Sequence, residues 1–225
     1  MSMNDLHLHV KGASQFVDDL TEPPGLLHGV VLTSPIAHGE IKSLNFDAAL
    51  KIPGIVAIFI AGDIPGQNQI GNIIQDEVLL AEKQLDFIGQ PIALVVGCTT
   101  KSAKRAAELI SMTYKEKTPV LDAREAFRKN LLISPPRTFN LGNIQSAWDL
   151  CDFILDGQVH SGGQEHVYLE TQTALAIPGE DGGVKIYSAT QSASLVQKTA
   201  ARVLGLATNR IEVEVPRLGG AFGGK

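Results

Sequence analysis

Residues 91–112 read PIALVVGCTTKSAKRAAELISM, and they carry the clearest structural signal in the chain. The stretch 91–97 is a continuous apolar run of the length of a buried strand. Over 101–112, alanine and isoleucine recur at i, i+3, i+4 and i+7, while lysine, arginine and glutamate occupy the opposite face. That spacing predicts an amphipathic helix. A strand followed directly by a helix is typical of a mixed α/β unit.

The segments around this stretch predict more strands of the same unit. Residues 26–33 (LLHGVVLT) and 55–60 (IVAIFI) are apolar runs of strand length, and we expect 55–60 to be buried. Weaker alternation predicts extended backbone over 41–46 and around Tyr114. Residues 63–71, rich in Gly, Pro, Gln and Asn, are expected to form a loop.

A boundary follows this unit. Asp122 and Glu125 have capping-box spacing for a short helix that ends near Lys129. The stretch 130–146 (NLLISPPRTFNLGNIQS) then combines Pro-Pro, Asn and Gly without a sustained period, and we place the division near residue 138. This gives one domain over 10–130 and a second over 138–225.

The second domain shows its own succession of elements. The expected strands are 151–161, 167–177, 184–189 and 210–215. Residues 192–205 have a helical apolar stripe, and Gly205 suits the position just after the helix end.

Composition excludes several classes of function. The net charge is −5 and 19% of the residues are charged, so no basic bias supports a nucleic acid or an anionic membrane as a partner. No apolar run reaches the roughly 18 residues of a membrane span, and the polar start of the chain predicts a cytoplasmic protein. The two cysteines, Cys98 and Cys151, lack CxxC spacing; we expect buried, reduced thiols.

The chain ends in a glycine-rich segment, residues 219–225 (GGAFGGK). Several glycines around one phenylalanine indicate a loop whose backbone N–H groups could form a nest for an anionic or oxygen-rich ligand. A plain turn is the simpler interpretation. A third is nucleotide binding, because Gly219, Gly224 and Lys225 match GxxxxGK after a strand, although no Ser or Thr and no helix follow.

Residues 162–170 (GGQEHVYLE) gather an amide, two carboxylates and an imidazole. His166 with Glu165 or Glu170 could be a metal site, but the spacing is not HExxH and no second ligand cluster accompanies it. A glycine turn that leads into a strand with polar ends is the structural alternative.

Several segments together resemble the xanthine dehydrogenase/aldehyde oxidase family. GGQEHVYLET, ATQSASLVQKTAARVLGLATNRIEVEV and RLGGAFGGK are similar to the start of its molybdopterin-binding region. GASQFVDDL, SPIAHGEIKSLNFDAALKIPGIVAIFIAGDIPG and FIGQPIALVVGCTTKSAKRAAELISMTY are similar to its preceding "hammerhead" domain. The resemblance implies an α+β fold: a hammerhead-like mixed α/β domain followed by the incomplete start of a molybdopterin-binding domain. AGDIPG and GGQEHVYLET favour xanthine dehydrogenase within the family.

The resemblance also implies a chemistry. The family oxidises a purine, another N-heterocycle or an aldehyde with water as the oxygen source, and its molybdenum is held by the pterin dithiolene rather than by side chains. Gln164 matches the glutamine whose amide hydrogen-bonds the molybdenum oxo group. Gly220, Phe222 and Gly223 match the loop that approaches the metal centre, with the phenyl ring excluding water.

The resemblance implies partners and missing parts as well. Iron–sulfur and FAD subunits or domains would receive the electrons, the remainder of the molybdopterin-binding subunit would complete the site, and a homo-oligomer is expected. The family's catalytic glutamate lies beyond Lys225, so we expect no catalytic residue in this chain, no activity from it alone, and no packing of its own for 218–225. A non-catalytic subunit-interaction module is the alternative of a different class.

Overall fold

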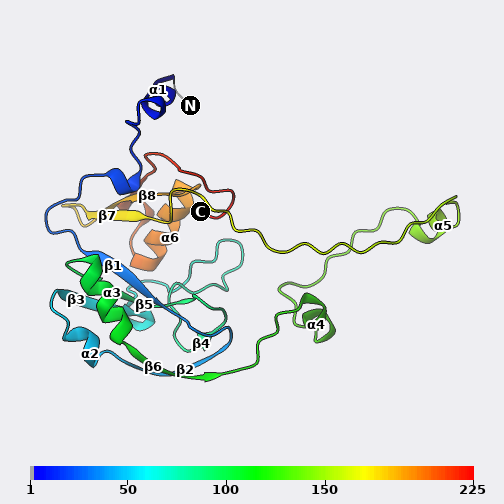
Figure 1. The fold of residues 1–225 in the computed structure, drawn as a ribbon, viewed down its shortest axis with the longest axis horizontal. Helices are drawn as coiled ribbons and strands as arrows, with labels where there is room; N and C mark the ends of the chain where they lie inside the picture. Colours follow the sequence, from blue (N-terminus) through cyan, green and yellow to red (C-terminus); the bar gives the residue numbers. More distant parts are fainter. Residues whose placement is uncertain (1–2) are drawn as a thin grey trace. The chain divides into compact units, whose positions relative to one another are not determined.

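The computed structural model describes residues 3–225 and divides them into two compact units (Figure 1). One comprises the described part of Met1–Thr118 together with His166–Lys225, and the other is Pro119–Glu165. The minor elements of the first unit are α1 (Met3–Val10) and the 3-10 helices η1 (Val17–Asp19), η2 (Ala61–Asp63) and η3 (Thr208–Arg210).

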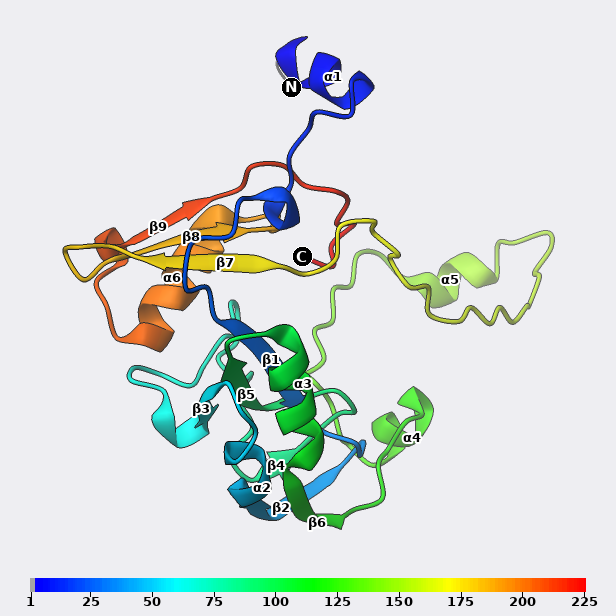
Figure 2. The same cartoon turned by 60° about the vertical axis from the view of Figure 1, so that its left-hand side comes forward.

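The first sheet is antiparallel, in the order β1-β5-β3. Its strands are β1 (His28–Thr33), β5 (Pro91–Gly97) and β3 (Ile55–Ile60). Helix α3 (Thr100–Leu109) begins at Thr99, whose hydroxyl accepts from the Ser102 N–H at 3.1 Å. Figure 2 shows α3 lying over β1 and β5, and Val95, Ala103 and Ala106 are fully buried between helix and sheet. The strand and helix predicted from 91–112 are therefore confirmed.

Two details of that prediction were wrong. The helix ends at Leu109, because Ile110 turns extended (ψ 119°) and the chain enters β6 (Ser111–Glu116). Strand β3 is only half-buried, with Val56 55% and Phe59 43% exposed. The reason is position: β3 is an edge strand, whereas β5 lies in the middle of the sheet.

A second sheet, in the order β4-β2-β6, extends the same unit. It consists of β4 (Gln84–Leu85), β2 (Gly39–Asn45) and β6, with α2 (Asp47–Leu50) directly after β2. Ile36, Ala81, Leu85 and Ile92 form its buried cluster. The extended backbone predicted over 41–46 and around Tyr114 is thus confirmed by the pairing of β2 with β6.

A third sheet, β7-β8-β9, is built by the C-terminal part of the unit. Its strands are β7 (Ala174–Pro178), β8 (Val184–Ser188) and β9 (Ile211–Glu214), and helix α6 (Ala193–Leu204) connects the parallel pair β8 and β9. Ser192 caps the start of α6, and Gly205 ends it in the left-handed conformation (φ 66°). The predicted helix and its terminal glycine are confirmed.

The loop after β3 closes the end of α6. Gly66 N–H donates to the Val203 carbonyl at 2.9 Å, and Gln67 N–H donates to the Arg202 carbonyl at 3.0 Å. The last carbonyls of a helix lack partners within it, so these two donors satisfy groups that would otherwise need water. The loop of the hammerhead-like part therefore serves as a C-cap for a helix of the C-terminal part.

The second unit contains two short helices, α4 (Ala123–Arg128) and α5 (Ile144–Trp148). Asp122 caps α4 as predicted, its carboxylate accepting from the Glu125 N–H at 2.8 Å. The strand predicted over 151–161 is absent from the described structure, and the one predicted over 167–177 shrinks to β7, because only β7 finds a neighbouring strand to pair with.

The cysteine prediction was also wrong. Cys98 and Cys151 are free, as expected, but both are exposed rather than buried. Cys98 follows β5 in a turn, and Cys151 follows α5 in the open second unit. Among residues 3–225, no helix has the length and apolar character needed to cross a bilayer.

Candidate functional site: the glycine loop after β9

The glycine loop, residues 219–224, follows β9 and turns sharply. Gly220 and Gly223 have φ angles of 99° and 92°, which a side chain would disfavour, and Phe222 itself is left-handed at 52°. A bulky residue in this region costs roughly 1–3 kcal/mol, so its surroundings must impose the conformation. Phe222 projects outward, 73% exposed, whereas the neighbouring Ala221 is buried.

Three side chains fasten the loop to the rest of the unit. The Glu170 carboxylate accepts from the Gly219 N–H at 2.7 Å, and the Gln191 amide oxygen accepts from the Gly223 N–H at 3.1 Å. The Gln172 amide donates to the Gly224 carbonyl at 2.9 Å. The expectation that 218–225 has no packing of its own was wrong, because residues after β8 and before β7 already supply its partners.

Lys225 lies inside this arrangement. Its side chain is fully buried, and Nζ lies 3.2 Å from Glu170 Oε2 and 4.9 Å from the centre of the Tyr168 ring. A phosphate-loop lysine must reach out to the β- and γ-phosphates. The buried, paired ammonium of Lys225 therefore contradicts the GxxxxGK interpretation.

The structure brings some of the predicted residues together. Gly220, Phe222 and Gly223 share one loop, whereas Gln164 belongs to Pro119–Glu165, where its exposed amide donates to the Glu165 carbonyl at 3.3 Å. Sequence reasoning missed the roles of Gln172 and Gln191. The strand assigned to 167–177 hid the turn that aims Gln172 at the loop, and no local signal distinguished Gln191 from an ordinary residue before a helix.

The loop offers hydrogen-bond donors to a ligand. Within the described part of the chain, the backbone N–H groups of Gly220 and Phe222 donate to no protein acceptor. A Cβ built on Gly223 would meet nothing within 4 Å, so space is open beside it. Free N–H groups in a left-handed turn favour an anionic or oxygen-rich ligand. Residues 3–225 contain no cluster of three or more His, Cys, Asp or Glu arranged to bind a metal.

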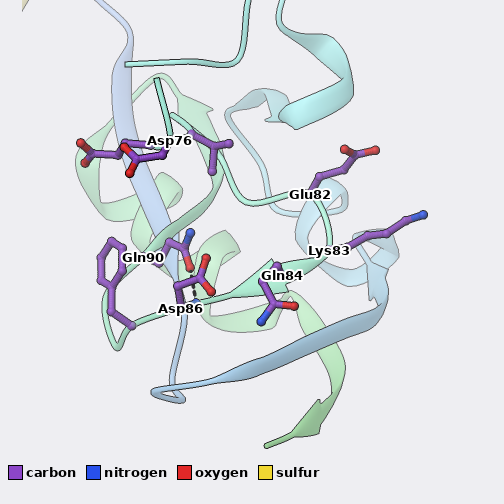
Figure 3. Close-up of a pocket in the computed structure, with 9 residues that line it drawn as sticks. Asp76, Glu82, Lys83, Gln84, Asp86 and Gln90 are labelled. Carbon is purple, nitrogen blue, oxygen red and sulfur yellow. Dashed lines mark hydrogen bonds between the residues drawn. The ribbon is translucent and has the colours of Figure 1, made fainter. Parts of the chain in front are cut away.

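Another hollow lies in the hammerhead-like part (Figure 3). Its lining is acidic, with Asp76, Glu77, Glu82 and Asp86 beside Lys83. Gln90 forms its buried wall and accepts from the Asp86 N–H at 2.8 Å, as the dashed line in Figure 3 shows. It contains none of the predicted site residues.

Two family models match successive parts of the chain. The family described as "Aldehyde oxidase and xanthine dehydrogenase, a/b hammerhead domain" matches residues 11–118, and "Molybdopterin cofactor-binding domain" matches residues 125–225. The xanthine dehydrogenase/oxidase of Gallus gallus is 37% identical over 95% of this chain. The aldehyde oxidase 2 of Macaca fascicularis is 39% identical over 96% of it.

Solved structures share the fold. Quinoline 2-oxidoreductase from Pseudomonas putida 86 has a TM-score of 0.84 and 24% identity, covering 97% of this chain and 30% of its own. The aldehyde oxidoreductase from Desulfovibrio gigas has a TM-score of 0.85 and 23% identity, covering 96% of this chain and 26% of its own. The chain spans about 16% of the length of the two curated relatives. It belongs to the xanthine dehydrogenase/aldehyde oxidase family of molybdenum hydroxylases, as a hammerhead domain followed by the start of a molybdopterin-binding domain.

Proposed function

We propose that this chain supplies one wall of the molybdenum-cofactor site in an oxidoreductase that hydroxylates a purine, another N-heterocycle or an aldehyde. The observation that carries the proposal is the fastened glycine loop with free N–H donors at Gly220 and Phe222, within the region matched by the cofactor-binding family. Such donors suit the oxygen-rich groups of a molybdopterin.

The side chains of this wall would have distinct tasks. Gln164 would hydrogen-bond the molybdenum oxo group through its neutral amide, which stabilises the oxo ligand without adding charge. Gly220 and Gly223 would let the backbone approach closely, and the exposed Phe222 ring would keep water away. The bound cofactor supplies the oxidation of the substrate carbon, with water as the oxygen source.

The electron acceptors and the catalytic base would be supplied from outside this chain. Iron–sulfur and FAD groups on partner subunits or domains would take the electrons, and a glutamate outside this chain would act as the base. The chain corresponds to about 16% of the length of its curated relatives, which supports the expectation that it does not turn over substrate alone.

The test is made in the assembled enzyme with Gln164→Ala and Phe222→Ala. Each should lower turnover at least about tenfold, because each removes a group that contacts the reacting centre, and molybdenum and pterin content should be measured in parallel. Phe153→Ala is the matched control, since that ring is 90% exposed and lies outside the loop. Turnover at the control's level in both site variants contradicts the proposal.

A further inference from the structure

A buried ion pair joins the two ends of the glycine loop. The side chains of Lys225 and Glu170 are 0% and 6% exposed. One carboxylate oxygen, Glu170 Oε2, accepts from the Gly219 N–H at 2.7 Å and from Lys225 Nζ at 3.2 Å. Gly219 and Lys225 flank the segment that contains Phe222, so a single oxygen sets the distance between the ends of the loop.

Other contacts around the ion pair fix the backbone of the glycine loop. The Glu170 N–H donates to the Gly219 carbonyl at 3.2 Å, so residue 170 binds Gly219 through both backbone and side chain. The Lys225 ammonium lies over the Tyr168 ring. A Cβ added at Gly220 would lie 3.0 Å from the Cβ of Tyr168. The carboxylate, the ammonium and the ring thus surround the base of the turn.

Ion pairs elsewhere in the described chain, such as Lys117–Glu40 and Lys185–Glu212, leave about a third or more of each side chain exposed. Exposed pairs contribute little, because water and salt screen them. A buried charge that loses its partner is strongly unfavourable. The other carboxylate oxygen, Glu170 Oε1, is buried and has no hydrogen-bond partner, so the carboxylate depends on the contacts of Oε2.

We propose that Glu170 is a positioning residue: with Lys225 it forms an ionic clamp that closes the glycine loop and keeps Phe222 left-handed, so that the free N–H groups of Gly220 and Phe222 face the cofactor. The link to the cofactor rests on the proposed function above. The clamp itself rests only on the contacts of Glu170 with Gly219 and Lys225.

A purely structural pair would stabilise the whole unit, whereas a clamp acts on the loop. Glu170→Gln distinguishes the two, because its amide oxygen can still accept from Gly219 while the negative charge is lost. Lys225→Met removes the opposite charge at similar length. The double variant leaves no buried unpaired charge, so its loop should be ordered better than that of either single variant.

The first measurement is amide hydrogen exchange of the 225-residue chain. In Glu170→Gln, amides of 219–225 should exchange at least about tenfold faster, with 91–112 unchanged, because the opening is local. The double variant should recover part of the protection. Glu180→Gln, at an exposed turn, is the matched control and should exchange like the unsubstituted chain. Unchanged loop exchange in Glu170→Gln, or faster exchange spread equally over 91–112, overturns the clamp.

The second measurement uses the assembled enzyme and separates the clamp from the cofactor. Glu170→Gln should lower molybdenum and pterin content several-fold, and the double variant should restore part of it. Full cofactor content in Glu170→Gln, together with faster loop exchange, overturns the positioning role while the clamp stands. Failure of the proposed function is seen independently, in unaffected turnover of Gln164→Ala and Phe222→Ala.

Discussion

The β5–α3 core and the Pro119–Glu165 segment contain similar apolar side chains, but these are buried in the core and exposed in the segment. Ile92 and Val95 on β5 are fully buried, whereas Ile133 is 98% and Leu155 96% exposed. The difference lies in the neighbours. Strand β5 has a strand on each side and a helix over one face, whereas no strand forms in the described Pro119–Glu165 segment. An apolar pattern becomes a strand only where another segment can pair with it and cover it.

The helices of the two regions also differ in burial rather than in capping. α3 and α5 both begin at side-chain caps, Thr99 and Asn143. α3 buries two alanines against a sheet, while α5 has no buried residue. Short helices are marginal in water without packing, so a cap alone gives α5 little stability.

Limited proteolysis gives the largest expected contrast between the regions. Trypsin should cut first after Arg137, within 134–142, and at least about a hundredfold faster than after Lys101, Lys104 or Arg105 on α3, because cleavage within a packed helix requires it to open. Mass spectrometry of the early fragments identifies the sites. Cleavage within 91–112 as fast as cleavage after Arg137 would contradict the expected difference in stability between the two regions.

A pair of matched substitutions tests whether burial separates the regions. Ile92→Ala should lower the free energy of unfolding by about 2–5 kcal/mol, since it leaves a cavity in a packed cluster. Ile133→Ala should change it by less than about 0.5 kcal/mol, because the side chain is exposed. Urea unfolding followed by circular dichroism measures both. Equal effects would mean that Ile133 is covered in solution.

Two glycines four residues apart, Gly62 and Gly66, test the cap on α6. Gly66→Ala should destabilise the unit by about 1–3 kcal/mol, because a Cβ would overlap the Arg202 carbonyl and displace two hydrogen bonds. Gly62→Ala is the control, since its Cβ would meet nothing within 4 Å. In thermal unfolding, Gly66→Ala should have a lower midpoint temperature than the unsubstituted chain, and Gly62→Ala should have nearly the same midpoint as that chain. A neutral Gly66→Ala would show that the loop does not hold the helix end.

The smallest expected effect is at the Glu40 carboxylate, in β2 of the first unit. Hydrogen bonds and charge from Lys117, then Lys42, lower the pKa of Glu40 from 4.5 to about 2. A folded-state pKa below the unfolded value stabilises above pH 4.5, and this contribution is lost as the pH falls toward 2. Glu40→Gln should therefore be slightly less stable than the unsubstituted chain near neutral pH, and the difference should vanish as the pH falls below about 2. The same difference at both pH values would contradict the pairing with Lys117.

The sequence by itself determined the elements whose local signals agree with their surroundings. β5, β3 and α6 lie close to the predicted bounds, because apolar run length, helical spacing and the caps at Ser192 and Gly205 act over a few residues. The motif resemblance likewise identified the family and the glycine loop. These features depend on neighbours along the chain.

Only the tertiary structure decided which apolar segments find partners. The exposed edge of β3, the missing strand over 151–161 and the exposed Cys98 all depend on what lies beside them in space. The loop partners Glu170, Gln172 and Gln191 also come from distant positions, and nothing in their local sequence points to Gly219, Gly224 or Gly223. Side-chain partners across tens of residues are set by how the sheets and helices pack, which spacing along the chain does not encode.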